Sequence, residues 1–206
     1  MNVFVFSGPD GSGKSTLVKE LSKSFDTVPH RHIVSWRRFF HVFSKGVNFL
    51  GRLLKQSYYF ITPTVRHGYH DYYGILGIIY ILTSVFDVLI FARVWWGISD
   101  IRHKHYIKII DRFYLDIVAD LIVDTRRTRL VLFLFDPIIR MHLRQCNVYL
   151  VYCEPDLVKQ RRPDIASDIK YGEKVSTYCL LRRLYGISVI NTSKSCPKDL
   201  VRIIPV

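Results

Sequence analysis

The chain is poor in cysteine and in acidic residues, and both shortages narrow the classes of protein to which it can belong. Its 206 residues include four cysteines, and none of them forms a Cys-x-x-Cys pair. This favours reduced thiols in a cytoplasmic protein over a disulfide framework or a zinc site. Asp and Glu number 17 against 30 Lys and Arg, which gives a formal net charge of +13. Such a charge suits an anionic ligand, namely a nucleotide, a nucleic acid or an acidic membrane surface, without deciding among them.

Internal repeats, low-complexity stretches and linkers are also missing. We therefore expect residues 1–206 to form a single domain, and this length is enough for one α/β domain with a full core. The N-terminus runs from an apolar segment straight into a glycine-rich loop, a pattern that does not fit a cleavable signal peptide.

That glycine-rich loop is the most informative motif in the chain. Residues 8–16 read Gly-Pro-Asp-Gly-Ser-Gly-Lys-Ser-Thr and match the phosphate-binding pattern G-x-x-x-x-G-K-[ST]. A segment typical of a strand precedes them and a segment typical of a helix follows, which is the context that the motif requires. We therefore expect an ATP site built from Gly8, Asp10, Gly11, Ser12, Gly13, Lys14, Ser15 and Thr16.

The residue types in this loop explain why it would bind phosphate. Glycines let the backbone curl so that its N–H groups point inward, and the N-terminus of the following helix adds a favourable dipole. Lys14 is expected to bridge the β- and γ-phosphates of ATP, and Ser15 is expected to hold Mg²⁺. A glycine-rich turn that matches by chance is the alternative, and the strand and helix around the loop argue against it.

Apolar strand patterns alternate with helical segments along the rest of the chain. Five segments are typical of buried strands, namely residues 2–7, 30–35, 106–111, 147–152 and 187–191. Strands separated by helices predict a parallel sheet of about five strands with helices on both faces, an α/β fold of three layers. Residues 37–70 are the least regular part. They are either a substrate-binding excursion, which we favour because they follow the second strand, or a solvated surface segment.

A carboxylate and an arginine end the third predicted strand, beside the predicted phosphate loop. Asp111 in this place is the usual partner of Mg²⁺, directly or through water. Arg112 next to it can hold a phosphate with its rigid guanidinium fork. The alternative is that Asp111 and Arg112 only form a structural salt bridge at the end of the strand.

The loop together with the run Asp111-Arg112-Phe113 resembles the thymidylate kinase family of P-loop nucleoside monophosphate kinases. That family has an acidic residue in the loop, as at Asp10, and an Asp-Arg-Tyr or similar triplet after the third strand. The resemblance covers most of the chain, with residues 37–105 matching poorly. It implies a three-layer P-loop NTPase fold and a phosphoryl transfer that uses ATP and Mg²⁺.

The resemblance also implies an arginine-rich lid over about residues 159–173. The basic residues that follow the fourth strand are Lys159, Arg161, Arg162 and Lys170. Arginines of such a lid close over the transferring phosphoryl group and neutralise its charge. Some relatives carry this arginine in the phosphate loop, where this chain has Gly11, so the lid must supply the charge. An exposed basic helix end is an equally good interpretation of Arg161 and Arg162.

The chain departs from the family where the acceptor is bound. Thymidylate kinases usually carry Arg-Glu-Pro-Gly after the second strand, where this chain has Ser-Trp-Arg-Arg, so only Arg37 or Arg38 can replace the phosphate-holding arginine. The thymine-reading run that usually follows the triplet is replaced by residues 114–120. The donor site therefore resembles the family more closely than the acceptor site does.

Together these patterns predict an ATP-dependent kinase that phosphorylates a nucleoside monophosphate, with dTMP to dTDP as the best guess. The expected catalytic residues are Lys14, Arg112, Arg161 and Arg162, the expected acceptor-binding residues are Asp10, Arg37, Arg38 and Arg112, and the expected metal ligands are Ser15 and Asp111. One alternative is a P-loop kinase acting on a lipid-linked or sugar-phosphate acceptor at a membrane surface. Another is a nucleotide-binding switch or ATPase associated with nucleic acid, against which the short chain and the lid-like arginines argue.

Residues 75–98 are the most apolar part of the chain. Their length approaches a membrane span, but Asp87 near the centre would make a lipid span costly. A helix that is buried in the core or in a homodimer interface is the interpretation we favour, and the resemblance also implies pairing through helices in this part of the chain. Peripheral contact with a membrane is the second interpretation, and a true span is the third.

Overall fold

A parallel sheet of five strands forms the centre of the molecule. The computed structural model describes residues 3–24, 31–35, 42–61, 66–92, 107–194 and 199–200. The strands are β1 (Val3–Ser7), β2 (Arg31–Ser35), β5 (Ile107–Asp111), β6 (Asn147–Tyr152) and β7 (Ser188–Asn191), arranged in the order β2-β5-β1-β6-β7. All four pairings are parallel. The five strands predicted from the sequence are thus confirmed, each within one residue of its expected position.

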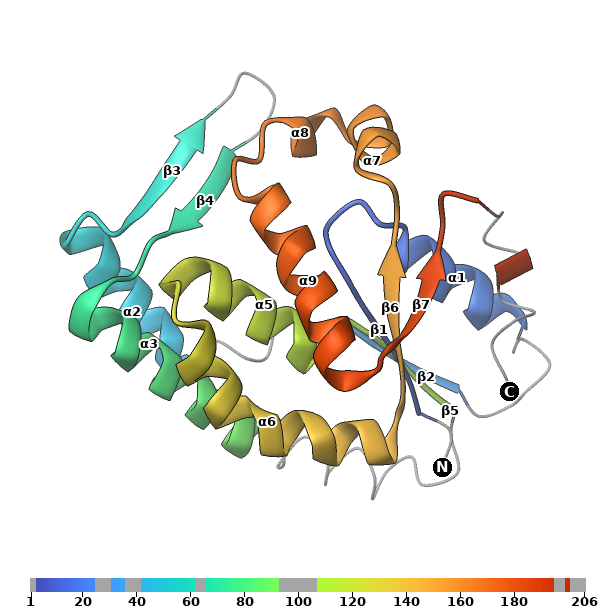
Figure 1. Ribbon diagram of the computed structural model, residues 1–206, viewed down its shortest axis with the longest axis horizontal. Helices are drawn as coiled ribbons and strands as arrows, with labels where there is room; N and C mark the ends of the chain where they lie inside the picture. Colours follow the sequence, from blue (N-terminus) through green and yellow to red (C-terminus); the bar gives the residue numbers. More distant parts are fainter. Residues whose placement is uncertain are drawn as a thin grey trace.

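Helices cover both faces of this sheet (Figure 1). Successive side chains of β1 alternate between the faces, so Val3 and Val5 enter one buried cluster while Phe4 and Phe6 enter another. Helix α1 (Lys14–Ser24) packs on the phenylalanine side. The other face carries α3 (Gly74–Asp87), α5 (Tyr114–Thr125), α6 (Thr128–Gln145) and α9 (Tyr171–Tyr185). The predicted three-layer α/β architecture is confirmed.

The strand order marks the carboxyl end of β1 as the place where a ligand is expected to bind. The chain leaves β1 through α1 toward β2 at one edge of the sheet, whereas β6 and β7 lie on the opposite side of β1. Ligands of open α/β sheets bind at the carboxyl ends of the strands where the order reverses in this way. The loop after β1 and the residues after β5 both lie at that point.

Residues 37–70, the irregular part of the sequence, contain a helix and a hairpin. Helix α2 (Val42–Leu53) is followed by the antiparallel strands β3 (Ser57–Ile61) and β4 (Arg66–His70). The sequence analysis did not predict this hairpin, because Arg66–His70 lacks the apolar run that is typical of the other strands. The expected substrate-binding excursion begins at residue 37, and residues 37–41 lie outside the described residues.

The apolar segment 75–98 begins as a helix that is covered on one side only. Helix α3 continues into a π-helical turn over Val88–Ala92, and residues 93–98 lie outside the described part. Asp87 is fully buried and accepts a hydrogen bond from the backbone N–H of Phe43 at 3.0 Å, which explains how a carboxylate is tolerated there. None of the helices in the described residues has the length and apolar character needed to cross a membrane.

The buried His142 at the end of α6 predicts a loss of stability in acid. Its ring lies 5.0 Å from that of Phe113 and 4.3 Å from that of Tyr114, and this burial lowers the pKa of His142 from 6.5 to about 4. The unfolded chain therefore binds one more proton than the folded chain between these values, so the free energy of unfolding should fall by about 1–3 kcal/mol from pH 7 to pH 4. Urea unfolding of wild type and His142→Leu measures this contribution. An equal pH slope in both proteins would contradict it.

Candidate active site

The conformation of the phosphate loop requires glycine at positions 8 and 11. Gly8 has φ +148°, and a Cβ added there would lie 2.2 Å from the carbonyl oxygen of Val151. Gly11 has φ +78°, and a Cβ there would lie 2.5 Å from Cγ1 of Val158 and 2.7 Å from Cδ1 of Ile165. Larger residues at either position would therefore push the loop away from β6 or from the segment that covers it.

Lys14 is folded into this loop. Its side chain is buried, and its Nζ donates hydrogen bonds to the carbonyl oxygens of Gly8 at 2.5 Å and Pro9 at 2.7 Å. Burial lowers the pKa of Lys14 from 10.5 to about 8, because desolvation outweighs the nearby carboxylates. An ammonium group held in this way is a ready partner for an anionic phosphate that enters the loop.

Ser15, in the first turn of α1, meets Asp111, the last residue of β5. The Ser15 hydroxyl donates to Oδ2 of Asp111 at 3.0 Å, although the two residues are 96 positions apart. The other oxygen, Oδ1, is buried and has no hydrogen-bond partner among the described residues. A hydroxyl beside a carboxylate with a vacant oxygen fits Mg²⁺, a hard cation that binds through one or two protein oxygens together with substrate phosphates.

Replacing Asp111 by Asn should weaken the dependence on this metal without disturbing the fold. The amide keeps an oxygen that can accept the Ser15 hydrogen bond but removes the negative charge that favours a divalent cation. We expect the Mg²⁺ concentration for half-maximal phosphoryl transfer to rise about tenfold, a change of about 1.4 kcal/mol. Asp136→Asn, an exposed carboxylate on α6, is the matched control. An unchanged Mg²⁺ titration would reduce Asp111 to a structural role.

Arg112 joins the end of β5 to the phosphate loop. Its backbone has φ +67°, a left-handed conformation that costs a non-glycine residue free energy and is often found at functional sites. Its N–H donates to the carbonyl of Phe6 at 2.9 Å, and its guanidinium is hydrogen-bonded to Asp10. That carboxylate raises the pKa of Arg112 against the opposing effect of burial, so the group stays charged. The two residues predicted from the sequence are thus brought together.

Asp116 is a residue of this site that the sequence analysis did not single out. Its carboxylate is buried and accepts three hydrogen bonds: from the N–H of Gly8 at 3.3 Å, from the N–H of Phe113 at 2.8 Å, and from the hydroxyl of Tyr178 at 2.7 Å. It therefore links the phosphate loop, the turn after β5 and helix α9. No local motif identifies it, because its partners are 62 and 108 residues away in the chain.

The predicted lid lies directly on the loop, but its arginines are otherwise engaged. Residues 159–173 cover the end of α7 (Pro155–Arg161), α8 (Pro163–Ala166) and the start of α9, and Ile165 among them packs on Gly11 together with Val158 just before them. The guanidinium of Arg162 makes a bidentate pair with Asp164, at 2.8 and 2.6 Å. The guanidinium of Arg161 lies 3.6 Å from the sulfur of Cys153. In this arrangement neither guanidinium contacts the phosphate loop among the described residues.

Lys170, expected as one of the basic lid residues, is buried instead. Its Nζ lies 2.9 Å from Asp71 and 3.0 Å from Asp124, and it also donates to the carbonyl of His70. Nearby, the hydroxyl of Tyr69 donates to Asp168 at 3.1 Å. The lysine thus ties the β3–β4 hairpin to α5 and to the end of the lid.

The turn after β7 also contacts the phosphate loop, whereas two expected residues of the site are not described. Thr192, just after β7, donates through its hydroxyl to the carbonyl of Ser12 at 2.8 Å, which joins this turn to the phosphate loop. Arg37 and Arg38, the expected acceptor-binding arginines, lie outside the described residues.

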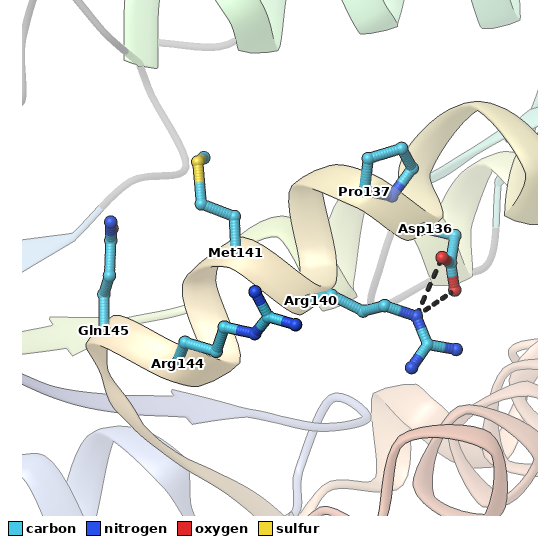
Figure 2. A pocket seen from close by; sticks show the side chains of 6 residues that line it. All are labelled: Asp136, Pro137, Arg140, Met141, Arg144 and Gln145. Carbon is cyan, nitrogen blue, oxygen red and sulfur yellow. Dashed lines mark hydrogen bonds and ion pairs between the residues drawn. The ribbon is translucent and has the colours of Figure 1, made fainter.

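A surface hollow of about 510 Å³ lies on α6, away from these residues (Figure 2). It is lined by Asp136, Pro137, Arg140, Met141, Arg144 and Gln145. Gln145, at the end of α6, lies just before the amino end of β6, whereas the phosphate loop follows the carboxyl end of β1. The hollow is therefore separate from the site described above.

Comparisons with known proteins identify the fold. No family model matches the chain, and no curated protein matches it in sequence. Among solved structures it is similar to thymidylate kinase from Candida albicans, with a TM-score of 0.58 and 9% identity over 98% of this chain and 88% of that one. It is also similar to thymidylate kinase from Ehrlichia chaffeensis, with a TM-score of 0.52 and 15% identity over 98% of this chain and 94% of that one. The chain therefore has a thymidylate kinase-like fold, as its phosphate loop and its Asp111-Arg112-Phe113 run predicted, and is a divergent example of it.

Proposed function

We propose that this chain is a kinase that transfers the γ-phosphoryl group of ATP to a nucleoside monophosphate, with dTMP as the first candidate. The observation that carries the proposal is the meeting of Lys14, Ser15 with Asp111, and Arg112 with Asp10 at one edge of the sheet. A cation, a metal site and an arginine held close together are the parts that phosphoryl transfer requires. The thymidylate kinases with which the chain shares its fold add to this support.

In this mechanism the protein positions the reactants and stabilises charge. Lys14 and the N–H groups of the loop hold the donor phosphates, and Ser15 and Asp111 would hold Mg²⁺. The metal, when bound, neutralises charge that develops on the phosphate oxygens. Arg112 orients the acceptor phosphate. This acceptor is already an anion, so no general base is needed and positioning supplies most of the rate.

The lid must change before it can contribute an arginine. Arg162 lies closest to the loop, since its Cγ is 3.8 Å from the position of a Cβ at Gly11. Its guanidinium would have to exchange Asp164 for the transferring phosphoryl group. Arg161 or Arg162 then supplies the positive charge that Gly11 cannot.

A different acceptor is the second candidate, and the surface of α5 favours it. Residues 114–120 stand where the family usually reads thymine, and within them Tyr114 and Leu115 are buried in the core while Asp116 is committed to the phosphate loop. Asp120, which remains half exposed, lies 3.4 Å from Lys174. A run whose side chains are engaged in this way offers little to read thymine, which favours an acceptor without that base, such as a sugar phosphate.

A panel of acceptors tests both candidates. The full chain is incubated with ATP, Mg²⁺ and one of dTMP, dUMP, CMP, UMP, AMP or a sugar phosphate, and ADP and the phosphorylated product are both measured. We expect product with dTMP and a higher KM or lower kcat for Arg112→Ala. Product with sugar phosphates alone would select the second candidate, and ADP formed equally without any acceptor would favour an ATPase.

A further inference from the structure

One buried carboxylate lies between the phosphate loop and the turn after β5. Asp116, in the first turn of α5, is 6% exposed, and its two oxygens accept hydrogen bonds from different segments. Oδ1 accepts from the N–H of Gly8, at the start of the phosphate loop, at 3.3 Å. Oδ2 accepts from the N–H of Phe113, the residue after Arg112, at 2.8 Å. A single side chain is therefore bonded to the donor-binding loop and to the turn that carries the arginine for the acceptor.

On the donor side, Gly8 is held at both ends of its backbone. Its N–H donates to Asp116, and its carbonyl oxygen accepts from Nζ of Lys14 at 2.5 Å. Gly8 has φ +148° and no room for a Cβ beside the carbonyl of Val151, so its place in the loop is narrowly determined. A displacement of Asp116 would move the residue to which the Lys14 ammonium is bonded.

On the acceptor side, the same carboxylate fixes the turn that carries Arg112. This arginine has a left-handed backbone with φ +67°, a conformation that persists only where the surrounding contacts determine it. The N–H of Arg112 donates to the carbonyl of Phe6 at 2.9 Å, and the N–H of Phe113 donates to Asp116 at 2.8 Å. Two successive N–H groups are thus anchored, and the direction of the guanidinium depends on both anchors.

Capping of α5 explains only one of these hydrogen bonds. An acidic residue in the first turn of a helix often accepts from the N–H of the residue before the helix, as Oδ2 does with Phe113. The cap does not require the contacts of Oδ1, which are with Gly8 and with the hydroxyl of Tyr178 at 2.7 Å. Tyr178 is buried and belongs to α9, which packs against α5 (Figure 1). The orientation of the carboxylate is therefore set from outside its own helix.

We propose that Asp116 is a positioning residue, which holds the phosphate loop and Arg112 in alignment for phosphoryl transfer. This inference rests on the proposed kinase function, and Asp116 acts through Gly8 and Arg112 rather than on a substrate. In-line transfer requires the donor phosphate and the attacking acceptor oxygen to be aligned, and a misplacement of about 1 Å can cost about a hundredfold in rate. Tyr178 supports the alignment by fixing the direction of Oδ1.

Asp116→Asn tests the proposal with almost no change in side-chain shape. The amide has one acceptor oxygen, and its NH₂ group would face an N–H donor, so either Gly8 or Phe113 loses its partner. We expect kcat at saturating ATP and acceptor to fall about a hundredfold, because the two halves of the site are no longer aligned. The Kd of ATP, measured by titration without acceptor, should change by less than about threefold, since the loop keeps its own phosphate-binding groups. The acceptor is the one selected by the panel described above.

Two further variants separate positioning from stability. Thr125→Val, at the other end of α5, removes a buried hydroxyl that donates to the carbonyl of Leu121 at 2.6 Å. This control should lower the unfolding temperature and leave kcat unchanged. Tyr178→Phe removes one of the three hydrogen bonds to Asp116 and should lower kcat by less than Asp116→Asn, because the bonds to Gly8 and Phe113 remain.

Thermal unfolding of each variant establishes whether it is folded at the assay temperature. A folded Asp116→Asn with kcat within about threefold of the wild type would overturn the proposal, as would a loss of ATP affinity that accounts for the whole fall in kcat/KM. If Asp116→Asn does not fold, Tyr178→Phe decides, and a kcat equal to that of the wild type would overturn the proposal. A wild type that phosphorylates no acceptor would remove the kinase function and this inference with it, whereas an active wild type with unaffected variants would remove the inference alone.

Discussion

Lys14→Ala should abolish most phosphoryl transfer while leaving the fold intact. The lysine is the only buried cation that the structure places within the phosphate loop itself, where it donates to the carbonyls of Gly8 and Pro9. Loss of a positioned cation at the transferring group should lower kcat/KM by about a hundredfold or more, which is about 3 kcal/mol of transition-state stabilisation. Steady-state kinetics with the acceptor selected by the panel measure the change.

The control for this variant is Lys19→Ala, a lysine of the same helix that is exposed. It should retain wild-type kinetics, because its side chain points away from the loop. Circular dichroism and thermal unfolding of both variants establish that the fold survives. Turnover of Lys14→Ala close to that of the wild type would contradict the proposed kinase function.

Lys170→Met should cost the protein a large part of its stability. The lysine is 5% exposed, and its Nζ lies within 3.0 Å of both Asp71 and Asp124. Removing it leaves Asp124 buried without a cation, and breaking a buried pair in this way typically costs about 3–5 kcal/mol. Urea unfolding at pH 8 measures the loss.

Three comparisons make this prediction specific. Burial already raises the pKa of Asp124 to about 7 with the lysine present, so without it the folded-state pKa lies higher still. Below about pH 7 the folded-state carboxyl of Asp124 is protonated with or without the lysine, so the loss caused by the substitution grows only above that pH and should be smaller at pH 5 than at pH 8. Lys170→Met with Asp124→Leu should recover most of the lost stability. Lys159→Met, at an exposed pair 3.8 Å from Asp156, should be neutral, and an equal loss there would refute the argument.

Features with a short-range signature were predictable from the sequence. The five strands are apolar runs separated by helical segments, and the glycines and lysine of the phosphate loop are specified within nine residues. Asp111 and Arg112 could be placed because they directly follow a predicted strand, and parallel strands bring their carboxyl ends to one edge. The structure then shows Asp111 within 3.0 Å of Ser15 and Arg112 bonded to Asp10.

Features that depend on distant partners could not be predicted in this way. In the sequence, Asp116 is one of several acidic residues in a helical segment and has no distinguishing pattern around it. Its hydrogen bond with the N–H of Gly8 joins residues that are 108 positions apart. Lys170 is one of several basic residues after β6, and only the packing of the hairpin against α5 shows that it is buried rather than part of a basic lid surface. The hairpin was missed because its second strand, Arg66–His70, lacks the apolar run that marks the strands of the main sheet.

The sequence by itself determined the kind of fold and the donor-binding loop, because periodicity and a contiguous motif are local properties of the chain. Only the tertiary structure decided which sides of the elements are covered. Helix α3 is apolar all round in the sequence, yet Leu76 and Ile81 are buried while Ile75 and Leu82 are exposed. Its neighbours α2, α5 and α6 approach from particular directions, and those directions are set by contacts between segments far apart in the chain. Contacts between distant segments also bring Val158 and Ile165 of the lid onto Gly11.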